Sequence, residues 1–209
     1  TGSSTTNFGR TLATGDLNTD GRADLAVSSA SGSYGYVYIF YNDGSIPTTS
    51  ATADVALSNG SAGSFGTGMA IGDWNADGRA DIAAGSPTFN GSRGVMHIFY
   101  NDGSMPVSSN DADVTITNYY NNSASFGYVI AAGDFNADGR MDLITSANSD
   151  ASAYGQVFVF YNDGSYPSDA VTADIIEIGE AANNYFGISL ATGDLNTDGK
   201  TDFAVGAYG

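Results

Sequence analysis

Four short acidic loops carry the residue types in this chain that are best suited to chemistry. In the first, Asp16, Asn18, Asp20 and Asp24 fall within nine residues, and Gly21 lies between them. Ca²⁺ takes about six to eight oxygen ligands, and a loop can supply them from alternate residues. Glycine permits the sharp bend that such a loop needs. The spacing therefore predicts a calcium site, and the same pattern recurs three more times.

We call these segments the Asp loops and expect about four bound Ca²⁺ in all, one per loop. The expected ligands are the side chains at positions 1, 3, 5 and 9 and the backbone carbonyl at position 7. For the first two loops they are Asp16, Asn18, Asp20, the Arg22 carbonyl and Asp24, and Asp73, Asn75, Asp77, the Arg79 carbonyl and Asp81. For the last two they are Asp134, Asn136, Asp138, the Arg140 carbonyl and Asp142, and Asp194, Asn196, Asp198, the Lys200 carbonyl and Asp202.

Two other interpretations of the Asp loops are possible. An EF-hand needs a glutamate at position 12 and flanking helices, but position 12 holds Val27, Ala84, Thr145 and Val205. Simple Asp-Gly turns without metal are the second alternative, and four copies with every ligand position filled favour calcium over it. The basic side chains at position 7 either pair with a neighbouring carboxylate or balance the charge of the loop, and we favour charge balance.

Composition narrows the possible partners and compartment. The formal net charge is −17, so nucleic acid and anionic membranes are poor partners, because binding them requires clustered Lys and Arg. No apolar run approaches the roughly 18 to 20 residues of a membrane helix, so we expect no membrane insertion. The absence of cysteine excludes disulfides and thiolate metal sites. Calcium can replace disulfides as a crosslink, and its abundance outside cells favours an extracellular or cell-surface location.

The Asp loops belong to a longer internal repeat. A Phe-Gly pair at Phe8, Phe65, Phe126 and Phe186 keeps the same spacings as the loops, which are 57, 61 and 60 residues. A third marker, "YNDGS", begins at Tyr41, Tyr100 and Tyr161. Three markers in one order indicate repeats at approximately 1–60, 61–122, 123–182 and a partial one at 183–209.

Each repeat has the pattern of four strands. In the first they are "RTLATGD", "ADLAVSSA", "YGYVYIFYN" and "ADVALSN", with Asp43-Gly44 as a turn. The segment "DIIEIGEAANN" aligns with fourth strands elsewhere, so it too is predicted to be a strand. Four antiparallel strands in tandem repeats of roughly 60 residues predict an all-β fold made of β-propeller blades.

The combination of Phe-Gly, a nine-residue Asp loop and a Gly-Ala-Pro-like segment resembles the FG-GAP repeat of integrin α-subunit propellers and their bacterial and extracellular relatives. The third element is degenerate here, with segments that start at Ser28, Gly85, Thr145 and Gly206. The resemblance covers essentially the whole chain. It implies a propeller with calcium in the loop between the first two strands of each blade.

The remaining aromatic residues and His97 are interpreted as structural. The repeated phenylalanines, the alternating aromatics of the third strands (Tyr38, Phe40, Phe99, Phe158 and Phe160) and Trp74 are expected in the core. His97, the single histidine, lies within a predicted strand and should be partly buried. No set of residues indicates a catalytic site, so the sequence predicts that this region is not an enzyme.

The segments that differ between repeats are where specific function is expected. Tyr119, Tyr120 and Phe89 are predicted to be exposed there, either to bind sugar or protein or to anchor the loops. Asn59, Asn90 and Asn121 begin Asn-x-Ser sequons.

Three complete blades and a half blade do not close a propeller, which typically needs about 4 to 8. The partners are therefore expected to be other copies of this chain, in a ring or filament, or the rest of a longer propeller. The sequence favours a calcium-stabilised binding or adhesion module for a protein or glycan ligand. The alternatives are a structural subunit of a self-assembling surface filament or ring, and a lectin or non-catalytic module of a secreted enzyme.

Overall fold

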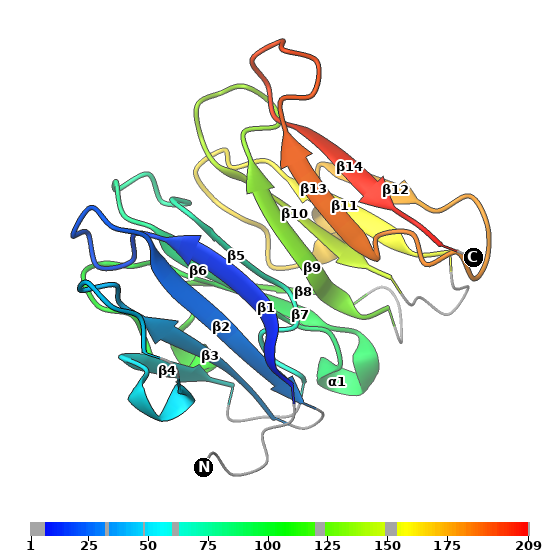
Figure 1. Ribbon diagram of the computed structural model, residues 1–209. Coiled ribbons are helices and arrows are strands. Elements are labelled where there is room, and N and C mark those ends of the chain that lie inside the picture. The colour runs from blue at the N-terminus through cyan, green and yellow to red at the C-terminus, as the bar shows by residue number, and fades with distance from the viewer. Residues whose placement is uncertain are drawn as a thin grey trace.

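The computed structural model describes residues 7–31, 34–47, 49–59, 63–119, 124–148 and 154–208. Their regular structure is almost entirely β, in three four-stranded sheets and one two-stranded sheet, all antiparallel. Each sheet follows the chain in order, so that every strand pairs with its sequence neighbour. The predicted fold class is therefore confirmed, and we call the sheets blades 1 to 3 and the half blade (Figure 1).

The strands agree closely with those expected from the sequence. Blade 1 contains β1 (Phe8–Gly15), β2 (Asp24–Ser31), β3 (Tyr34–Phe40) and β4 (Val55–Ser58). Blade 2 contains β5 (Met69–Gly72), β6 (Asp81–Ser86), β7 (Val95–Phe99) and β8 (Val114–Thr117). Blade 3 contains β9 (Phe126–Gly133), β10 (Asp142–Ala147), β11 (Gln156–Phe160) and β12 (Ile175–Ile178), and the half blade contains β13 (Ser189–Gly193) and β14 (Asp202–Gly206).

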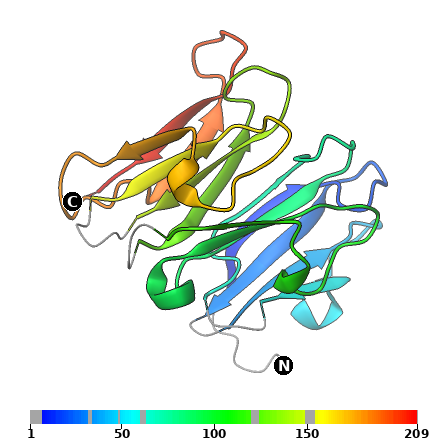
Figure 2. The same cartoon turned by 180° about the vertical axis from the view of Figure 1, so that it is seen from behind.

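Short helical turns complete the described structure. The turns η1 (Ser50–Thr52), η2 (Ser109–Asp111) and η3 (Ala170–Thr172) each precede the fourth strand of a blade (Figure 2). One further turn, α1 (Phe89–Ser92), joins β6 to β7. None of the helices in the described part of the chain is long and apolar enough to cross a membrane.

The blades stand side by side in an open arc. Their first strands β1, β5, β9 and β13 are neighbours on the inner side, and all run in the same direction (Figure 1). The Asp loops, which follow these strands, therefore gather at one rim of the arc. The Phe-Gly pairs, which open the strands, lie at the opposite rim.

Apolar side chains fill the space between consecutive blades. Val37 and Ile39 of blade 1 pack with Phe65, Ile82 and Phe99 of blade 2 in one core cluster. We call the face that meets the next blade the front face and the other the back face. The same arrangement is repeated between blades 2 and 3 and between blade 3 and the half blade. Blades 2 and 3 therefore each bury both faces on their two neighbours, as expected for stacked repeats.

Of the four repeated phenylalanines, three follow this arrangement, although Phe186 next to the half blade is only partly buried, and Phe8 is an exception. Phe65 and Phe126 are fully buried, but Phe8 is 46% exposed because no described blade covers the back face of blade 1. Tyr38 on that face is half-buried and stacks on Tyr36. The other third-strand aromatics named above are buried as expected, and so is Trp74.

His97 is a structural residue, as predicted. It is 9% exposed on β7, packs against the rings of Phe65 and Phe99, and forms a 3.1 Å hydrogen bond between Nδ1 and Thr115 Oγ1. Burial lowers the pKa of His97 to about 4, since desolvation penalises the charged imidazolium. The ring is therefore neutral at physiological pH.

The predictions for the variable segments have mixed outcomes. Tyr119 is 60% exposed as expected, whereas Phe89 is half-buried. Asn59 is buried, and its Nδ2 donates to Ser86 Oγ at 3.0 Å, so the asparagine of this sequon is not accessible in the folded chain. Asn90 is exposed in a left-handed backbone conformation. Tyr120 and Asn121 lie outside the described residues.

A glycine at or just before the start of the third strand lets the backbones of two blades touch. A Cβ atom at Gly94 would overlap the backbone nitrogen and oxygen of Phe126 in blade 3, and the φ of Gly94 is +87°. Gly35 meets Phe65, and Gly155 meets Phe186, in the same way. The Phe-Gly pair of one blade is thus held against the preceding blade at a site where a side chain has no room.

We predict that Gly94→Ala lowers the free energy of unfolding by about 3 kcal/mol or more, because it combines a left-handed alanine with a backbone overlap. Gly91→Ala is the matched control, since its φ is +70° and nothing lies within 4 Å of its added Cβ. This control should cost only about 1 kcal/mol. Urea denaturation measures both, and equal losses would contradict the proposed contact between blades.

Candidate metal centre

Positions 1, 3 and 5 of each Asp loop hold a tight turn by hydrogen bonds from loop amides. In the first loop the Asp20 amide donates to Asp16 Oδ1 at 3.1 Å and to Asn18 Oδ1 at 3.0 Å. The Gly21 amide donates to Asp16 Oδ2 at 2.9 Å, and the Arg22 amide to Asp20 Oδ1 at 2.9 Å. Since one N–H is shared between them, the oxygens of positions 1 and 3 converge.

The other three loops repeat this geometry closely. The position-5 amide again lies between the oxygens of positions 1 and 3, at 3.1 and 3.0 Å for Asp77, 3.1 and 2.9 Å for Asp138, and 3.2 and 2.8 Å for Asp198. The glycine at position 6 has a φ between +83° and +86° in all four loops. Such a φ is accessible to glycine at little cost, so each Asp-Gly pair fixes the bend.

Position 9 is placed differently from the other predicted ligands. Asp24, Asp81 and Asp142 are completely buried. Asp24 Oδ2 accepts from the Leu17 and Asn18 amides at 2.8 and 3.2 Å, and its Oδ1 accepts from the Asn42 amide at 2.7 Å. The structure therefore brings positions 1, 3 and 5 together, while position 9 joins the Asp loop to the "YNDGS" segment.

The side chains at positions 1, 3 and 5 meet some of the requirements of a calcium site. Asp, Asn and Asp at positions 1, 3 and 5 offer hard oxygens, and each carboxylate oxygen that accepts one N–H keeps a second lone pair. These side chains are at least partly exposed in all four loops. Among the described residues, however, no three acidic or histidine side chains converge closely enough to enclose a metal ion. The oxygens thus fit calcium in type, and calcium in the loops stays a prediction.

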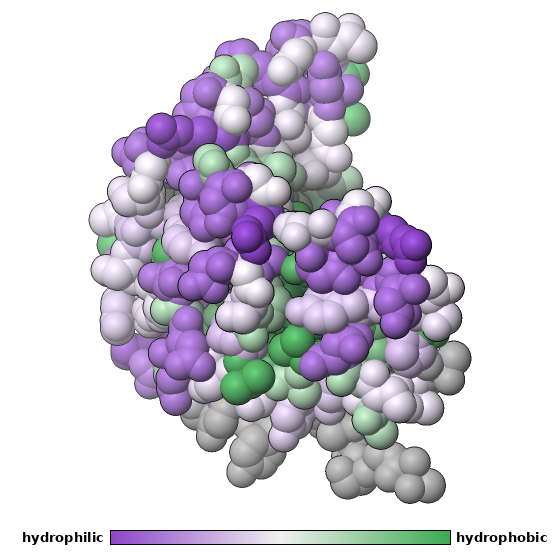
Figure 3. All heavy atoms as spheres, turned by 90° about the vertical axis from the view of Figure 1, so that its left-hand side faces the viewer, coloured by the Kyte–Doolittle hydropathy of each residue, from purple (hydrophilic) through white to green (hydrophobic). Residues whose placement is uncertain are grey.

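The arginine side chains at position 7 extend across the loop toward the turn of the "YNDGS" segment in the same blade. Arg22 Nη1 donates to the Asn42 carbonyl at 3.4 Å. Arg79 and Arg140 place Nη1 3.1 Å from the position that a Cβ would take on Gly103 and Gly164. These contacts place a cation at the rim of an acidic loop, against the turn rather than over the carboxylates. The rim that carries the Asp loops is largely hydrophilic (Figure 3).

Sequence reasoning missed the main role of the asparagine in "YNDGS". We call Asn42–Gly44, Asn101–Gly103 and Asn162–Gly164 the NDG turns. Asn101 is 2% exposed, and its Nδ2 donates to the Leu17 carbonyl of blade 1 at 2.7 Å and to the Ala80 carbonyl at 3.2 Å. Asn162 makes the equivalent bond to Trp74 of blade 2 at 2.8 Å. The NDG turn of one blade therefore binds the Asp loop of the preceding blade.

The apolar residue at loop position 2 is buried by this contact. Leu17 and Trp74 are each 2% exposed beneath the next blade, whereas Leu195 in the half blade is 71% exposed. A further repeated acid holds the residue before each NDG turn: Asp54, Asp113 and Asp174 accept from the amides of Tyr41, Tyr100 and Tyr161 at 2.7 to 2.8 Å. The only sequence signal for these roles was the recurrence of the residues.

The buried carboxylates carry an electrostatic cost. Burial raises the pKa of Asp81 to about 6, although hydrogen bonds from the Asn101, Trp74 and Asn75 amides oppose the shift. Burial also raises the pKa of Asp142, against the same kinds of bonds. A cation in the loop would oppose this cost, because a positive charge nearby favours the ionised carboxylate.

We predict that Asn101→Ala lowers the free energy of unfolding by about 2 to 4 kcal/mol, because the Leu17 and Ala80 carbonyls lose their donor in a buried site. Asn42→Ala is the matched control. Asn42 Nδ2 donates to Ala23 in its own blade, and the side chain is half-buried, so the expected loss is about 1 kcal/mol. Chemical denaturation at fixed calcium concentration compares the two variants. An equal loss would show that the bond across the blades adds nothing.

The sequence of the chain matches a known repeat family and is similar to several known proteins. A family model described as an FG-GAP-like repeat matches residues 16–84, and one described as an FG-GAP repeat matches residues 126–160 and 186–209. Phosphatidylinositol-glycan-specific phospholipase D of Rattus norvegicus is 31% identical over 88% of this chain and 24% of its own length.

Integrins are also similar to the chain. Integrin alpha-PS2 of Drosophila melanogaster is 32% identical over 68% of this chain and 10% of its own length. Integrin alpha-7 of Mus musculus is 40% identical over 41% of this chain and 7% of its own length. The chain therefore spans a quarter or less of each of these relatives.

Proposed function

The chain belongs to the FG-GAP repeat family, and we propose that it is part of an extracellular, calcium-stabilised β-propeller that acts as a non-catalytic binding or adhesion module. The single observation that best supports calcium is the repeated convergence of Asp and Asn oxygens on one loop amide in all four Asp loops. Such convergence leaves carboxylate and amide oxygens with spare lone pairs close together on an exposed loop, and these are the ligand types that Ca²⁺ prefers.

In this proposal the residues of the first Asp loop have separate roles. Asp16, Asn18 and Asp20 would hold the ion from the exposed side, and Gly21 allows the chain to bend around it. Asp24, from the buried side, fixes the amides of Leu17 and Asn18. Bound Ca²⁺ supplies positive charge that neutralises these carboxylates. The loop would then present the Leu17 carbonyl in a fixed place to Asn101 of the next blade.

A binding role is supported by the range of relatives. The chain is similar both to proteins named integrins and to one named a phospholipase D, so this similarity by itself does not specify a reaction. His97 is buried and neutral, and we assign no catalytic role to any described residue. An extracellular location suits oxygen-only calcium sites of modest affinity, since free calcium is abundant there.

Assembly with a neighbouring blade is a second candidate role, supported by the uncovered back face of blade 1. Leu12 is 61% exposed, whereas the equivalent Met69 and Ile130 of blades 2 and 3 are each 5% exposed. We propose that a further blade covers this face, either from a longer propeller or from another copy of the chain. Analytical ultracentrifugation of the purified chain distinguishes the two, because only the second gives a dimer or larger species.

We predict that Tb³⁺, which uses the same oxygen ligands as Ca²⁺, binds the second Asp loop and emits when Trp74 is excited. Trp74 is the only tryptophan and occupies position 2 of that loop. Excitation at wavelengths that tyrosine does not absorb isolates this loop. Added Ca²⁺ should displace Tb³⁺ and abolish the emission, and a chelator should lower the melting temperature of the calcium-loaded chain.

Paired variants test the ligands. Asp73→Asn with Asp77→Asn should remove the emission, since both carboxylates leave the site. Asp194→Asn with Asp198→Asn makes the same charge change in the fourth loop and should leave Trp74-sensitised emission unchanged. Emission that persists in the first pair, or a melting temperature that chelation does not change, would refute calcium binding at the Asp loops.

A further inference from the structure

The residue that follows each Phe-Gly pair differs in every blade, although the pair itself is constant. The residue after each Phe-Gly pair is Arg10, Thr67, Tyr128 or Ile188. In the described structure these residues lie near the start of the first strands, at the rim opposite the Asp loops. A side chain that varies beside a constant Phe-Gly pair is expected to take part in ligand recognition, because stability does not fix its residue type.

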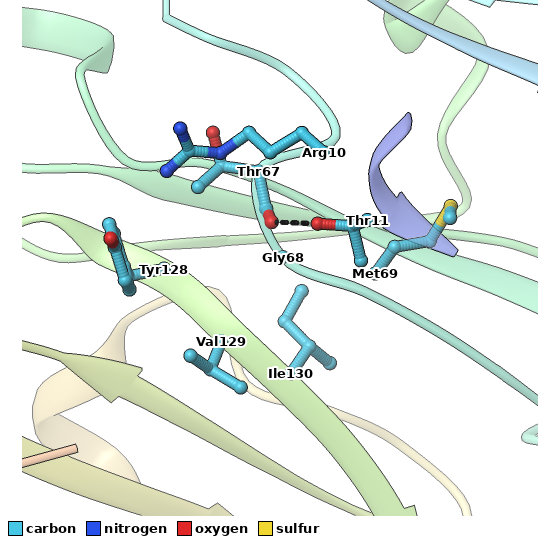
Figure 4. A pocket seen from close by; sticks show the side chains of 8 residues that line it. All are labelled: Arg10, Thr11, Thr67, Gly68, Met69, Tyr128, Val129 and Ile130. Atoms are coloured by element: carbon cyan, nitrogen blue, oxygen red, sulfur yellow. Dashed lines mark hydrogen bonds between the residues drawn. The ribbon is translucent and has the colours of Figure 1, made fainter. Parts of the chain in front are cut away.

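Three of these residues surround a cavity between the inner strands. The cavity has a volume of about 370 Å³, and Arg10, Thr67 and Tyr128 line it together with residues of β1, β5 and β9 (Figure 4). A second recess of about 210 Å³ shares the same three side chains. Cavities of this size accommodate small ligands or a single residue of a larger one.

Arg10 gives this cavity a positive charge. Its Cζ lies 5.7 Å from the centre of the Tyr128 ring, which holds the guanidinium by a cation–π contact. The side chain is exposed, and among the described residues no hydrogen bond or ion pair engages its guanidinium. Four of the six basic residues of the chain sit at position 7 of Asp loops, whereas Arg10 lies on β1 toward the opposite rim. A planar guanidinium with free N–H groups is suited to a carboxylate.

The other residues of the cavity determine which groups a ligand must carry besides an anionic group. Met69 and Ile130 are nearly buried and provide an apolar floor. Thr11 Oγ1 donates its proton to the Thr67 carbonyl, and Thr67 Oγ1 donates to the Ser64 carbonyl, each at 2.7 Å. Both hydroxyls can therefore only accept from a ligand, and they suit an N–H group.

We propose that this cavity binds a carboxylate attached to an apolar body that also carries an amide N–H. This chemistry occurs in the C-terminal residue of a peptide and in a free N-acylated amino acid. The carboxylate pairs with Arg10, the apolar body rests on Met69 and Ile130, and the N–H donates to a threonine hydroxyl. The proposal gives the binding module a ligand, but it does not require calcium, since the Asp loops lie at the other rim.

The test uses methyl NMR of Met69 and Ile130 during titration with N-acetyl-L-leucine and with a five-residue peptide that ends in leucine. We expect saturable shifts of both methyl groups, with a dissociation constant on the order of 1 mM for the small ligand. A peptide that binds at least about tenfold more tightly identifies a chain terminus as the source, and equal affinity identifies the small acid.

Variants and analogues locate the interaction. Arg10→Gln should weaken binding at least about tenfold, and Arg10→Lys should weaken it less. Tyr128→Ala should also weaken binding, whereas Tyr128→Phe, which keeps the aromatic ring, should not. Tyr119→Ala removes an exposed tyrosine elsewhere and should leave binding unchanged. The melting temperature of each variant checks that it is folded.

The proposal is wrong if the methyl shifts do not saturate, or if Arg10→Gln binds as tightly as the unaltered chain. It is also wrong if N-acetyl-L-leucinamide, which lacks the carboxylate, or glucuronate, which lacks the apolar body, binds equally well. Tb³⁺ emission from the second Asp loop is measured on the same samples. A negative ligand result with intact emission overturns this inference alone and leaves the calcium proposal standing.

Discussion

The stacking of these blades depends on one buried carboxylate that binds backbone amides from two segments. Asp81 accepts from Trp74 in its own Asp loop and from Asn101 in the NDG turn, at 2.9 and 2.8 Å. Asn101 in turn reaches the Leu17 carbonyl of the preceding blade. A buried carboxylate without these donors would be strongly destabilising. The loop, the turn and the contact between blades therefore form as a unit, which explains why all of its residues recur together.

This arrangement separates stability from recognition. The Asp loops, the NDG turns and the apolar faces recur in every complete blade and lie toward one rim or between the sheets. The residues after Phe-Gly, at the other rim, are free to differ, and there Arg10 meets Tyr128 above a cavity. Because these variable residues lie outside the apolar clusters between consecutive blades, a change at one of them leaves those clusters intact.

Local pattern predicted most of the fold from the sequence. Alternating residues located the strands, and Asp-Gly pairs located the turns, because these features depend on near neighbours in the chain. The bond from Asn101 to Leu17 joins residues 84 apart, and no local pattern reports it. The burial of Asn59 and the exposure of Phe8 likewise depend on which blade lies alongside. The cavity between Arg10 and Tyr128 exists only once three blades are in place.

Amide hydrogen exchange with and without calcium tests most directly whether the Asp loops hold the blades together. The informative amides are those of Asn101 and Asn162, which donate to Asp81 and Asp142 at 2.8 Å. We expect both to exchange as slowly as the central strands when calcium is present. On chelation both should lose protection together, before the strands do. Unchanged exchange of these two amides after calcium is removed would contradict the account.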